Sequence, residues 1–184
     1  RLDLKALIGE KFAGLRPIVC ANLPYNITTP VLTQLLECGV FRSITVMIQR
    51  EVARRICAQP GTADYGAFSL LCQYHARCEY LFEVPRECFL PAPKVTSAGV
   101  RLEILDQPPV SVADESLFFR VVRAAFAQRR KTLVNALHAA FGTQVSKEQL
   151  AACLADCNLP VTVRGETLGL VEFAQLSAAL GPLI

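Results

Sequence analysis

Four consecutive residues, Asn22-Leu23-Pro24-Tyr25, are of the types that could hold an exocyclic adenine amine for methyl transfer. They follow an apolar run at 18–21 that is typical of a strand buried on both faces. In open α/β sheets, ligands bind at the carboxyl ends of the strands. An adenine amine is a poor nucleophile because its lone pair is delocalised into the ring. The Asn22 amide oxygen and the Leu23 carbonyl oxygen could accept the amine hydrogens and direct the lone pair at an electrophilic methyl group.

Pro24 and Tyr25 would complete such a site without an acid or a base. Pro24 lacks an N–H group and has a fixed φ angle, which makes the turn stiff. The Tyr25 ring could stack on the base, an interaction worth about 1–3 kcal/mol. No carboxylate or histidine is required, because the proton can leave to water after the transfer. The alternative interpretation of these four residues alone is an ordinary loop.

The elements that would position this turn follow an α/β pattern. Strands are predicted at 18–21, 43–48, 80–84 and 97–105, and helices at 31–38, 51–58 and 66–74, after a short helix or connector within 1–14. The strand at 43–48 is predicted to be a second buried strand, like that at 18–21. Strand, helix, strand, helix and a hairpin-like pair form the second half of a doubly wound sheet. A stiff proline-rich loop at 89–95 separates the last two strands.

The tripeptide Gln107-Pro108-Pro109 marks a domain boundary, after which no strand pattern is convincing. Four helices are predicted beyond it, and Ser146 with Gln149 predicts a capping box at the third of them. The predicted helices span 114–127, 129–141, 146–157 and 169–180.

Charge is distributed unevenly along the 184 residues, whose net charge is +3. The stretch 116–147 carries +6 and no acidic residue, so the rest of the chain sums to −3. This asymmetry favours an RNA backbone site in the helical region over a plain solvated face. The candidates there are Arg120, Arg123, Arg129, Arg130 and Lys131, and Arg50 and Arg54 on an earlier helix are further candidates.

Other classes of protein are disfavoured by composition. Eight cysteines include no CxxC pair, so a zinc ribbon is not expected, and scattered buried thiols indicate a reducing compartment. His75 and His138 are expected to be packed or surface residues, so neither a metal site nor a thiol–histidine pair is predicted. The longest uncharged run, 17–36, contains too many polar residues and prolines for a transmembrane helix.

Six segments resemble the rRNA adenine N6-dimethyltransferases, and they occur in the family's order. The small-subunit type is the best match because of the RRKTLVNAL helix. The segments are NLPYNITT at 22–29, QREVARRI at 49–56, DYGAFSLLCQ at 64–73, FLPAPKVTS at 89–97, FAQRRKTLVNAL at 126–137 and RGETLGLVEF at 164–173.

This resemblance implies a Rossmann-like methyltransferase core over 1–107 and a helical rRNA-binding domain over 110–184. It implies S-adenosylmethionine as donor, contacted by Asn22, and a catalytic set of Asn22, Leu23, Pro24, Tyr25 and Phe89. The implied acceptors are two adjacent adenosines near the 3′ end of 16S rRNA in an immature 30S subunit. We therefore expect a cytoplasmic, monomeric enzyme without a metal.

The family's glycine-rich donor turn and its acidic ribose-binding residue have no counterpart in this sequence and would precede Arg1. We therefore expect the chain to be the C-terminal two-thirds of such an enzyme, with little or no donor binding by itself. The alternatives are a nucleic-acid-binding relative without activity, a 23S rRNA adenine methylase of the resistance type and a DNA adenine methylase.

Overall fold

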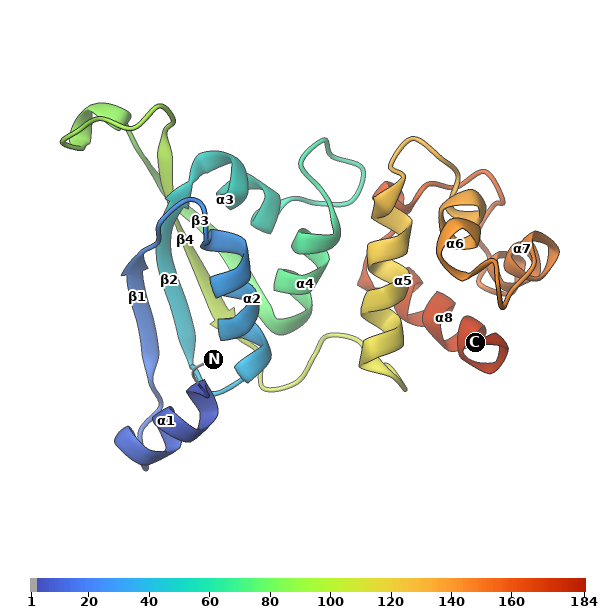
Figure 1. Ribbon diagram of the computed structural model, residues 1–184, viewed down its shortest axis with the longest axis horizontal. Helices are drawn as coiled ribbons and strands as arrows, with labels where there is room; N and C mark the ends of the chain where they lie inside the picture. Colours follow the sequence, from blue (N-terminus) through green and yellow to red (C-terminus); the bar gives the residue numbers. More distant parts are fainter. Residues whose placement is uncertain (1–2) are drawn as a thin grey trace. The chain divides into compact units, whose positions relative to one another are not determined.

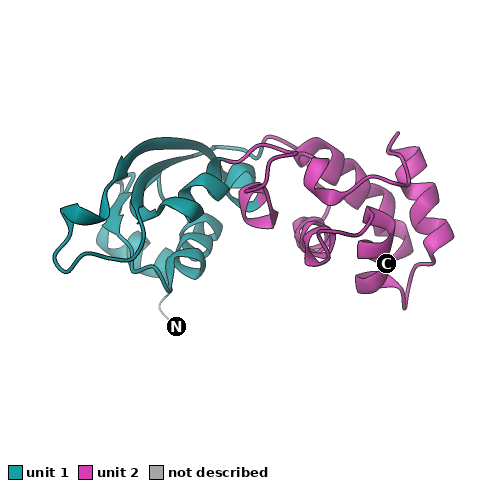
Figure 2. Cartoon of the chain, turned by 90° about the horizontal axis from the view of Figure 1, so that it is seen from above, with its two compact units in different colours: residues 1–57, 71–108 teal, residues 58–70, 109–184 magenta. Residues whose placement is uncertain are grey.

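The computed structural model describes residues 3–184, so residues 1–2 of the predicted first segment lie outside the described residues. The chain divides into two compact units (Figure 2). Unit 1 comprises Arg1–Cys57 and Leu71–Pro108, and unit 2 comprises Ala58–Leu70 and Pro109–Ile184.

Unit 1 is built on a four-stranded sheet in the order β1-β2-β4-β3 (Figure 1). Its strands are β1 (Ile18–Asn22), β2 (Ser43–Gln49), β3 (Ala76–Val84) and β4 (Ser97–Ile104). The β1–β2 pair is parallel, whereas β4 pairs antiparallel with both β2 and β3. This mixed sheet confirms the predicted α/β class and the hairpin-like final pair.

In chain order, the helices with residues in unit 1 are α1 (Leu4–Lys11), α2 (Thr28–Cys38), α3 (Arg50–Cys57), α4 (Ala67–His75), whose first four residues lie in unit 2, and the short η1 (Arg86–Cys88). Figure 1 shows α2 and α3 on the same side of the strands. The inward residues pair across β2 and β4, as Ile44 with Leu102 and Val46 with Val100, and all four are at most 1% exposed.

The first two strands are less buried than the sequence predicts. β1 alternates between exposed and half-buried residues, and Ile18 is 63% exposed. The reason is that β1 is an edge strand of the described sheet, with β2 as its neighbour there. β2 buries one face only, so the expectation of two strands buried on both faces is wrong.

Unit 2 contains the four predicted helices, α5 (Glu115–Ala127), α6 (Leu133–Phe141), α7 (Lys147–Asp156) and α8 (Leu170–Leu180), with the short turns η2 (Gly165–Thr167) and η3 (Gly181–Leu183). The predicted capping box is confirmed, because Ser146 and Gln149 exchange bonds of 2.9 and 3.2 Å. The start predicted for α6 at Arg129 is wrong. Residues 128–130 form a turn, in which the Lys131 N–H donates to the Gln128 carbonyl at 2.9 Å, and Thr132 occupies the N-cap position of a helix that begins at Leu133.

The segment Ala58–Leu70 belongs to unit 2, so the domain predicted over 1–107 differs from unit 1 by this segment. Tyr65 is 1% exposed, and its hydroxyl donates to the carbonyl of Leu168 at 2.8 Å. Its ring meets Phe126 edge-on with centroids 5.8 Å apart. Burial and the charge of Glu172 raise the pKa of Tyr65, so the phenol stays protonated at neutral pH and keeps this bond.

Candidate functional site

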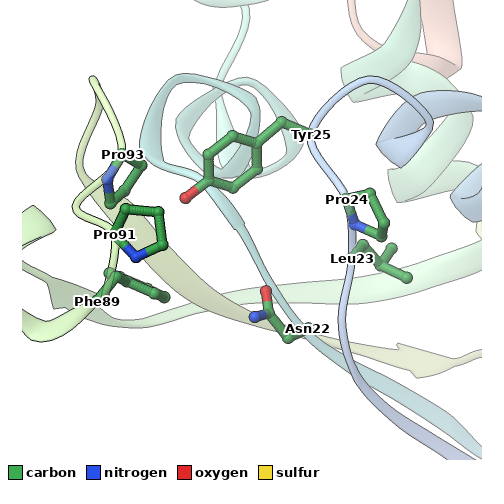
Figure 3. Close-up of a pocket in the computed structure, with 7 residues that line it drawn as sticks. All are labelled: Asn22, Leu23, Pro24, Tyr25, Phe89, Pro91 and Pro93. Atoms are coloured by element: carbon green, nitrogen blue, oxygen red, sulfur yellow. The ribbon is translucent and has the colours of Figure 1, made fainter.

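A pocket of about 270 Å³ opens where β1 ends, and its lining includes every residue of the predicted catalytic set. One wall is the turn after β1, and the other is the proline-rich loop before β4 (Figure 3). The lining residues are Asn22, Leu23, Pro24, Tyr25, Phe89, Pro91 and Pro93. The two prolines were not in the predicted set, although their spacing after Phe89 in the sequence is the signal that could have included them.

The turn that forms the first wall extends the hydrogen bonding between the parallel strands β1 and β2 by one residue, and the chain then leaves the sheet. Asn22 pairs with Met47, and the N–H of Leu23 still donates to the Met47 carbonyl at 3.1 Å. Pro24 cannot donate to a ladder, so the chain turns away there. Asn22 is exposed, and its amide points into the space between Tyr25 and Phe89 (Figure 3). Within residues 3–184, neither the Asn22 side chain nor the Leu23 carbonyl makes a hydrogen bond.

Hydrogen bonds fix both the Tyr25 side chain and the turn that carries it. Its hydroxyl lies 2.6 Å from the hydroxyl of Ser97, a fully buried residue at the start of β4. The Pro24 carbonyl accepts from the Ile27 N–H at 3.2 Å and from the Thr28 hydroxyl at 3.1 Å. These bonds connect the turn to α2 and to the sheet, so the ring is positioned before any ligand arrives.

The second wall begins at Phe89, directly after η1. The Phe89 N–H donates to the Arg86 carbonyl at 3.2 Å, and its ring is half-buried. The aromatic groups of Tyr25 and Phe89 therefore lie on the two walls of one pocket. Among residues 3–184, no carboxylate, imidazole or cationic side chain lines it. The pocket can accept hydrogen bonds and stack on a planar group, but it offers no strong acid or base.

The two basic residues predicted on the earlier helix share one acidic partner. Arg50 and Arg54 lie on α3, and their guanidinium groups reach Glu83 at 3.4 and 3.3 Å. The Tyr80 hydroxyl also donates to Glu83 at 3.0 Å. This hydrogen bond and the two arginines hold the pKa of Glu83 below its usual range, so the carboxylate stays charged and offsets part of the basic charge.

The five basic residues predicted in unit 2 are all exposed, but they do not have the same surroundings. Arg129 donates to Glu166 at 2.9 Å and to the Thr62 carbonyl at 3.2 Å, so it holds the segment 58–70 in place. Arg120 lies over the Phe141 ring, 5.3 Å from its centroid. Arg123, Arg130 and Lys131 have no ion pair among the described residues.

The thiols of Cys72 and Cys78 are poor nucleophiles. Burial raises the pKa of Cys72 well above its ordinary value, and burial with the charge of Cys57 raises the pKa of Cys78 to about 12. The eight cysteines are free thiols. No three metal-binding side chains gather among residues 3–184, and no helix there is both long and apolar enough to cross a membrane.

The sheet, with a pocket at its strand ends, has the architecture of Rossmann-like methyltransferases. A dimethyladenosine transferase from Plasmodium falciparum superposes on 94% of this chain and 70% of its own with a TM-score of 0.78 at 21% sequence identity. The 23S rRNA methyltransferase ErmE superposes on 93% of this chain and 70% of its own with a TM-score of 0.63 at 21% identity.

Residues 7–173 match the family described as ribosomal RNA adenine dimethylase, and the chain belongs to this family. It is 47% identical over its whole length to "Ribosomal RNA small subunit methyltransferase A" of Geobacillus kaustophilus, and it spans 64% of that relative. It is 49% identical over 98% of its length to the protein of the same name from Streptococcus gordonii, of which it spans 63%.

Proposed function

We propose that this chain forms the target-base pocket and RNA-binding part of an enzyme that methylates N6 of two adjacent adenosines near the 3′ end of 16S rRNA. One observation carries the proposal. Two hydrogen-bond acceptors without partners, on Asn22 and Leu23, line the same pocket as the aromatic rings of Tyr25 and Phe89. The names of the small-subunit relatives support the choice of 16S rRNA.

In this proposal the pocket positions the base and leaves the proton to solvent. The Asn22 amide oxygen and the Leu23 carbonyl each accept one hydrogen of the adenine amine, which turns its lone pair out of conjugation with the ring. Tyr25 and Phe89 hold the two faces of the base. No acid or base from the described part of the chain lines the pocket, so in this proposal the proton released after transfer passes to water.

The methyl donor implied by the family is S-adenosylmethionine, whose sulfonium supplies an electrophilic methyl group. Asn22 is the described residue that fits a contact with it, because its exposed amide lies at the carboxyl end of a parallel strand. The Asn22 amide oxygen and the Leu23 carbonyl remain the two acceptors for the base, so the Asn22 amide contacts both the donor and the target.

The substrate base must leave its stack to enter this pocket. An adenine amine inside a helix is out of reach, so enzymes that modify bases act on unpaired or extruded nucleotides. The pocket has a volume of about 270 Å³, which leaves room for a purine base between its two walls.

The proposed partner is the immature 30S subunit in the cytoplasm. The choice of 16S rRNA over 23S rRNA is tested by incubating the complete protein with the methyl donor and either immature 30S or 50S particles. The modified nucleosides are identified by mass spectrometry. We expect N6,N6-dimethyladenosine at adjacent positions of 16S rRNA. Methylated adenosine in 23S rRNA would support the alternative of a resistance-type methylase. RNA binding without any methylation would support the alternative of a non-enzymatic relative.

Two replacements of Tyr25 test whether its ring or its hydroxyl contributes to methyl transfer. A stacked base is worth about 1–3 kcal/mol, so Tyr25→Ala should lower kcat/KM by about 5- to 150-fold. Tyr25→Phe keeps the ring and loses only the contact with Ser97, so it should retain most of the activity. Steady-state methylation of immature 30S particles measures both variants. Equal losses in the two variants would contradict a stacking role.

Charge reversal at Arg130 and Lys131 tests the proposed RNA surface of unit 2. The double variant Arg130→Glu/Lys131→Glu should weaken RNA binding and reduce the slope of log Kd against log salt by about 0.7–0.9 per lost phosphate contact. Arg129 is left intact because it holds Glu166 and Thr62.

The matched control for this pair is Lys5→Glu/Lys11→Glu, which changes the net charge equally on the exposed helix α1. Binding is measured by fluorescence anisotropy with a labelled 16S rRNA fragment over a range of salt concentrations. A slope no different from that of the control would show that Arg130 and Lys131 face solvent in the complex.

A further inference from the structure

A second pocket of about 270 Å³ adjoins the proline-rich loop that forms one wall of the first. It is lined by three cationic side chains, Arg50, Arg86 and Lys94, and by one carboxylate, Glu51. The other lining residues are Gln49, Val95 and Thr96. No charged side chain of residues 3–184 lines the first pocket, so the two pockets would bind different chemical groups.

The cations of this second pocket have unused hydrogen-bonding capacity. Lys94 is exposed and forms no ion pair within residues 3–184. Arg86 is 60% exposed and uses only Nε toward Glu87, at 2.9 Å, which leaves its two terminal nitrogens available. Arg50 holds Glu83 at 3.4 Å, a longer contact than that of Arg86. A ligand with several acceptor oxygens and a negative charge matches this arrangement.

The two pockets are connected through short, rigid contacts. Pro93 lines the first pocket and Lys94 lines the second, and neighbouring Cα atoms are about 3.8 Å apart. The Arg50 N–H donates to the Thr96 carbonyl at 3.0 Å, which fixes the start of α3 to the same loop. The next residue, Ser97, contacts the Tyr25 hydroxyl of the first pocket at 2.6 Å. A ligand that fills both pockets would therefore carry a base and an anionic group close together.

We propose that Arg50, Arg86 and Lys94 bind a backbone phosphate of the RNA strand that flanks the target adenosine. The proposal rests on the assignment of the first pocket to the target base. An unpaired nucleotide carries its base and its phosphates on one sugar, so a base in the first pocket brings a phosphate toward the second. Arginine matches phosphate with a planar fork of donors and lysine as a point charge. This phosphate contact would fix which base along the strand enters the pocket.

The double variant Arg86→Ala/Lys94→Ala tests this proposal in the complete protein, and each of its single variants is compared with Arg77→Ala, which removes one charge elsewhere. Arg77 is also an exposed arginine paired with a glutamate, Glu103, but it lies near the opposite end of β3. Seven residue steps along the strand separate it from Val84, about 23 Å at 3.3 Å per residue. The probe is a synthetic RNA stem–loop with two adjacent adenosines in its loop.

We expect the double variant to raise the Kd of this RNA about 5- to 20-fold at low salt, and to reduce the salt slope by about 0.7 per lost contact. Its KM for RNA should rise, whereas kcat at saturating RNA should stay within about twofold, because neither residue touches the base. A Kd and a slope equal to those of Arg77→Ala would overturn the proposal.

A chemical change in the RNA identifies the ligand as a particular phosphate. A methylphosphonate removes the charge of one backbone position, and it is placed in turn on each side of the target adenosine. At the contacted position, the protein variant and the methylphosphonate should weaken binding no more together than either does alone. Fully additive losses at every position would overturn the proposal. A different outcome would contradict the proposed function and not the phosphate contact. In that outcome the losses of affinity are non-additive as expected, but neither the wild-type protein nor any variant methylates the RNA.

Discussion

Replacing Asn22 with alanine should lower methyl transfer by at least about 100-fold and leave the affinity for RNA within about twofold. Removal of a hydrogen-bond group that is directed at developing charge costs about 10²–10³ in kcat. The Asn22 side chain is exposed and makes no hydrogen bond within residues 3–184, so its loss should change the free energy of unfolding by less than about 0.5 kcal/mol.

Asn26→Ala is the matched control, because Asn26 is an exposed asparagine of the same loop that does not line the pocket. Single-turnover rates on immature 30S particles, measured together with Kd, separate chemistry from binding. Methylation by Asn22→Ala at the rate of Asn26→Ala would refute the role of this amide. Loss of RNA binding in the Asn22 variant would show that the side chain serves affinity rather than chemistry.

Replacing Tyr65 with alanine should destabilise unit 2 by about 3–5 kcal/mol, the usual cost of truncating a large buried aromatic side chain. The ring is 1% exposed and packs edge-on against Phe126, and its hydroxyl holds the Leu168 carbonyl. The substitution removes the ring contact and the bond that fix Ala58–Leu70 within unit 2. Hydrogen exchange of the α5 and α8 amides reports the stability of this unit directly.

Tyr65→Phe provides the comparison for this prediction. It keeps the ring and leaves the Leu168 carbonyl without the phenolic donor, which should cost about 1 kcal/mol, within the range for an unpaired buried acceptor. Protection of α5 and α8 in Tyr65→Ala equal to that in Tyr65→Phe would show that the segment adds nothing to unit 2 through this ring.

The parts of the site that are continuous in sequence were predictable. Asn22 to Tyr25 combines the end of an apolar run with turn chemistry, and both signals are local. Phe89 joins the pocket from 64 residues further along the chain. No periodicity shows that the two loops meet, so its assignment depended on resemblance to a family.

Features that depend on distant partners were not predictable from local patterns. Tyr65 bonds a carbonyl 103 residues away, so the pattern that predicted a helix in the first domain could not show that Ala58–Leu70 belongs to the second unit. The basic neighbours of Arg129 predict a phosphate ligand, whereas its partner Glu166 lies 37 residues further on and is not visible in the local pattern. The apolar run at 18–21 predicted a strand but not which neighbours cover it.

The claim that the pocket between Asn22 and Phe89 receives the target adenine is tested most directly by photo-cross-linking. The RNA stem–loop carries 8-azidoadenosine at one of its two adjacent adenosines, and the cross-linked peptide is identified by mass spectrometry after irradiation with the complete protein. The account predicts cross-links to the aromatic walls at Tyr25 or Phe89, competed away by unmodified RNA. Cross-links found only within 116–147 of the helical unit would contradict it.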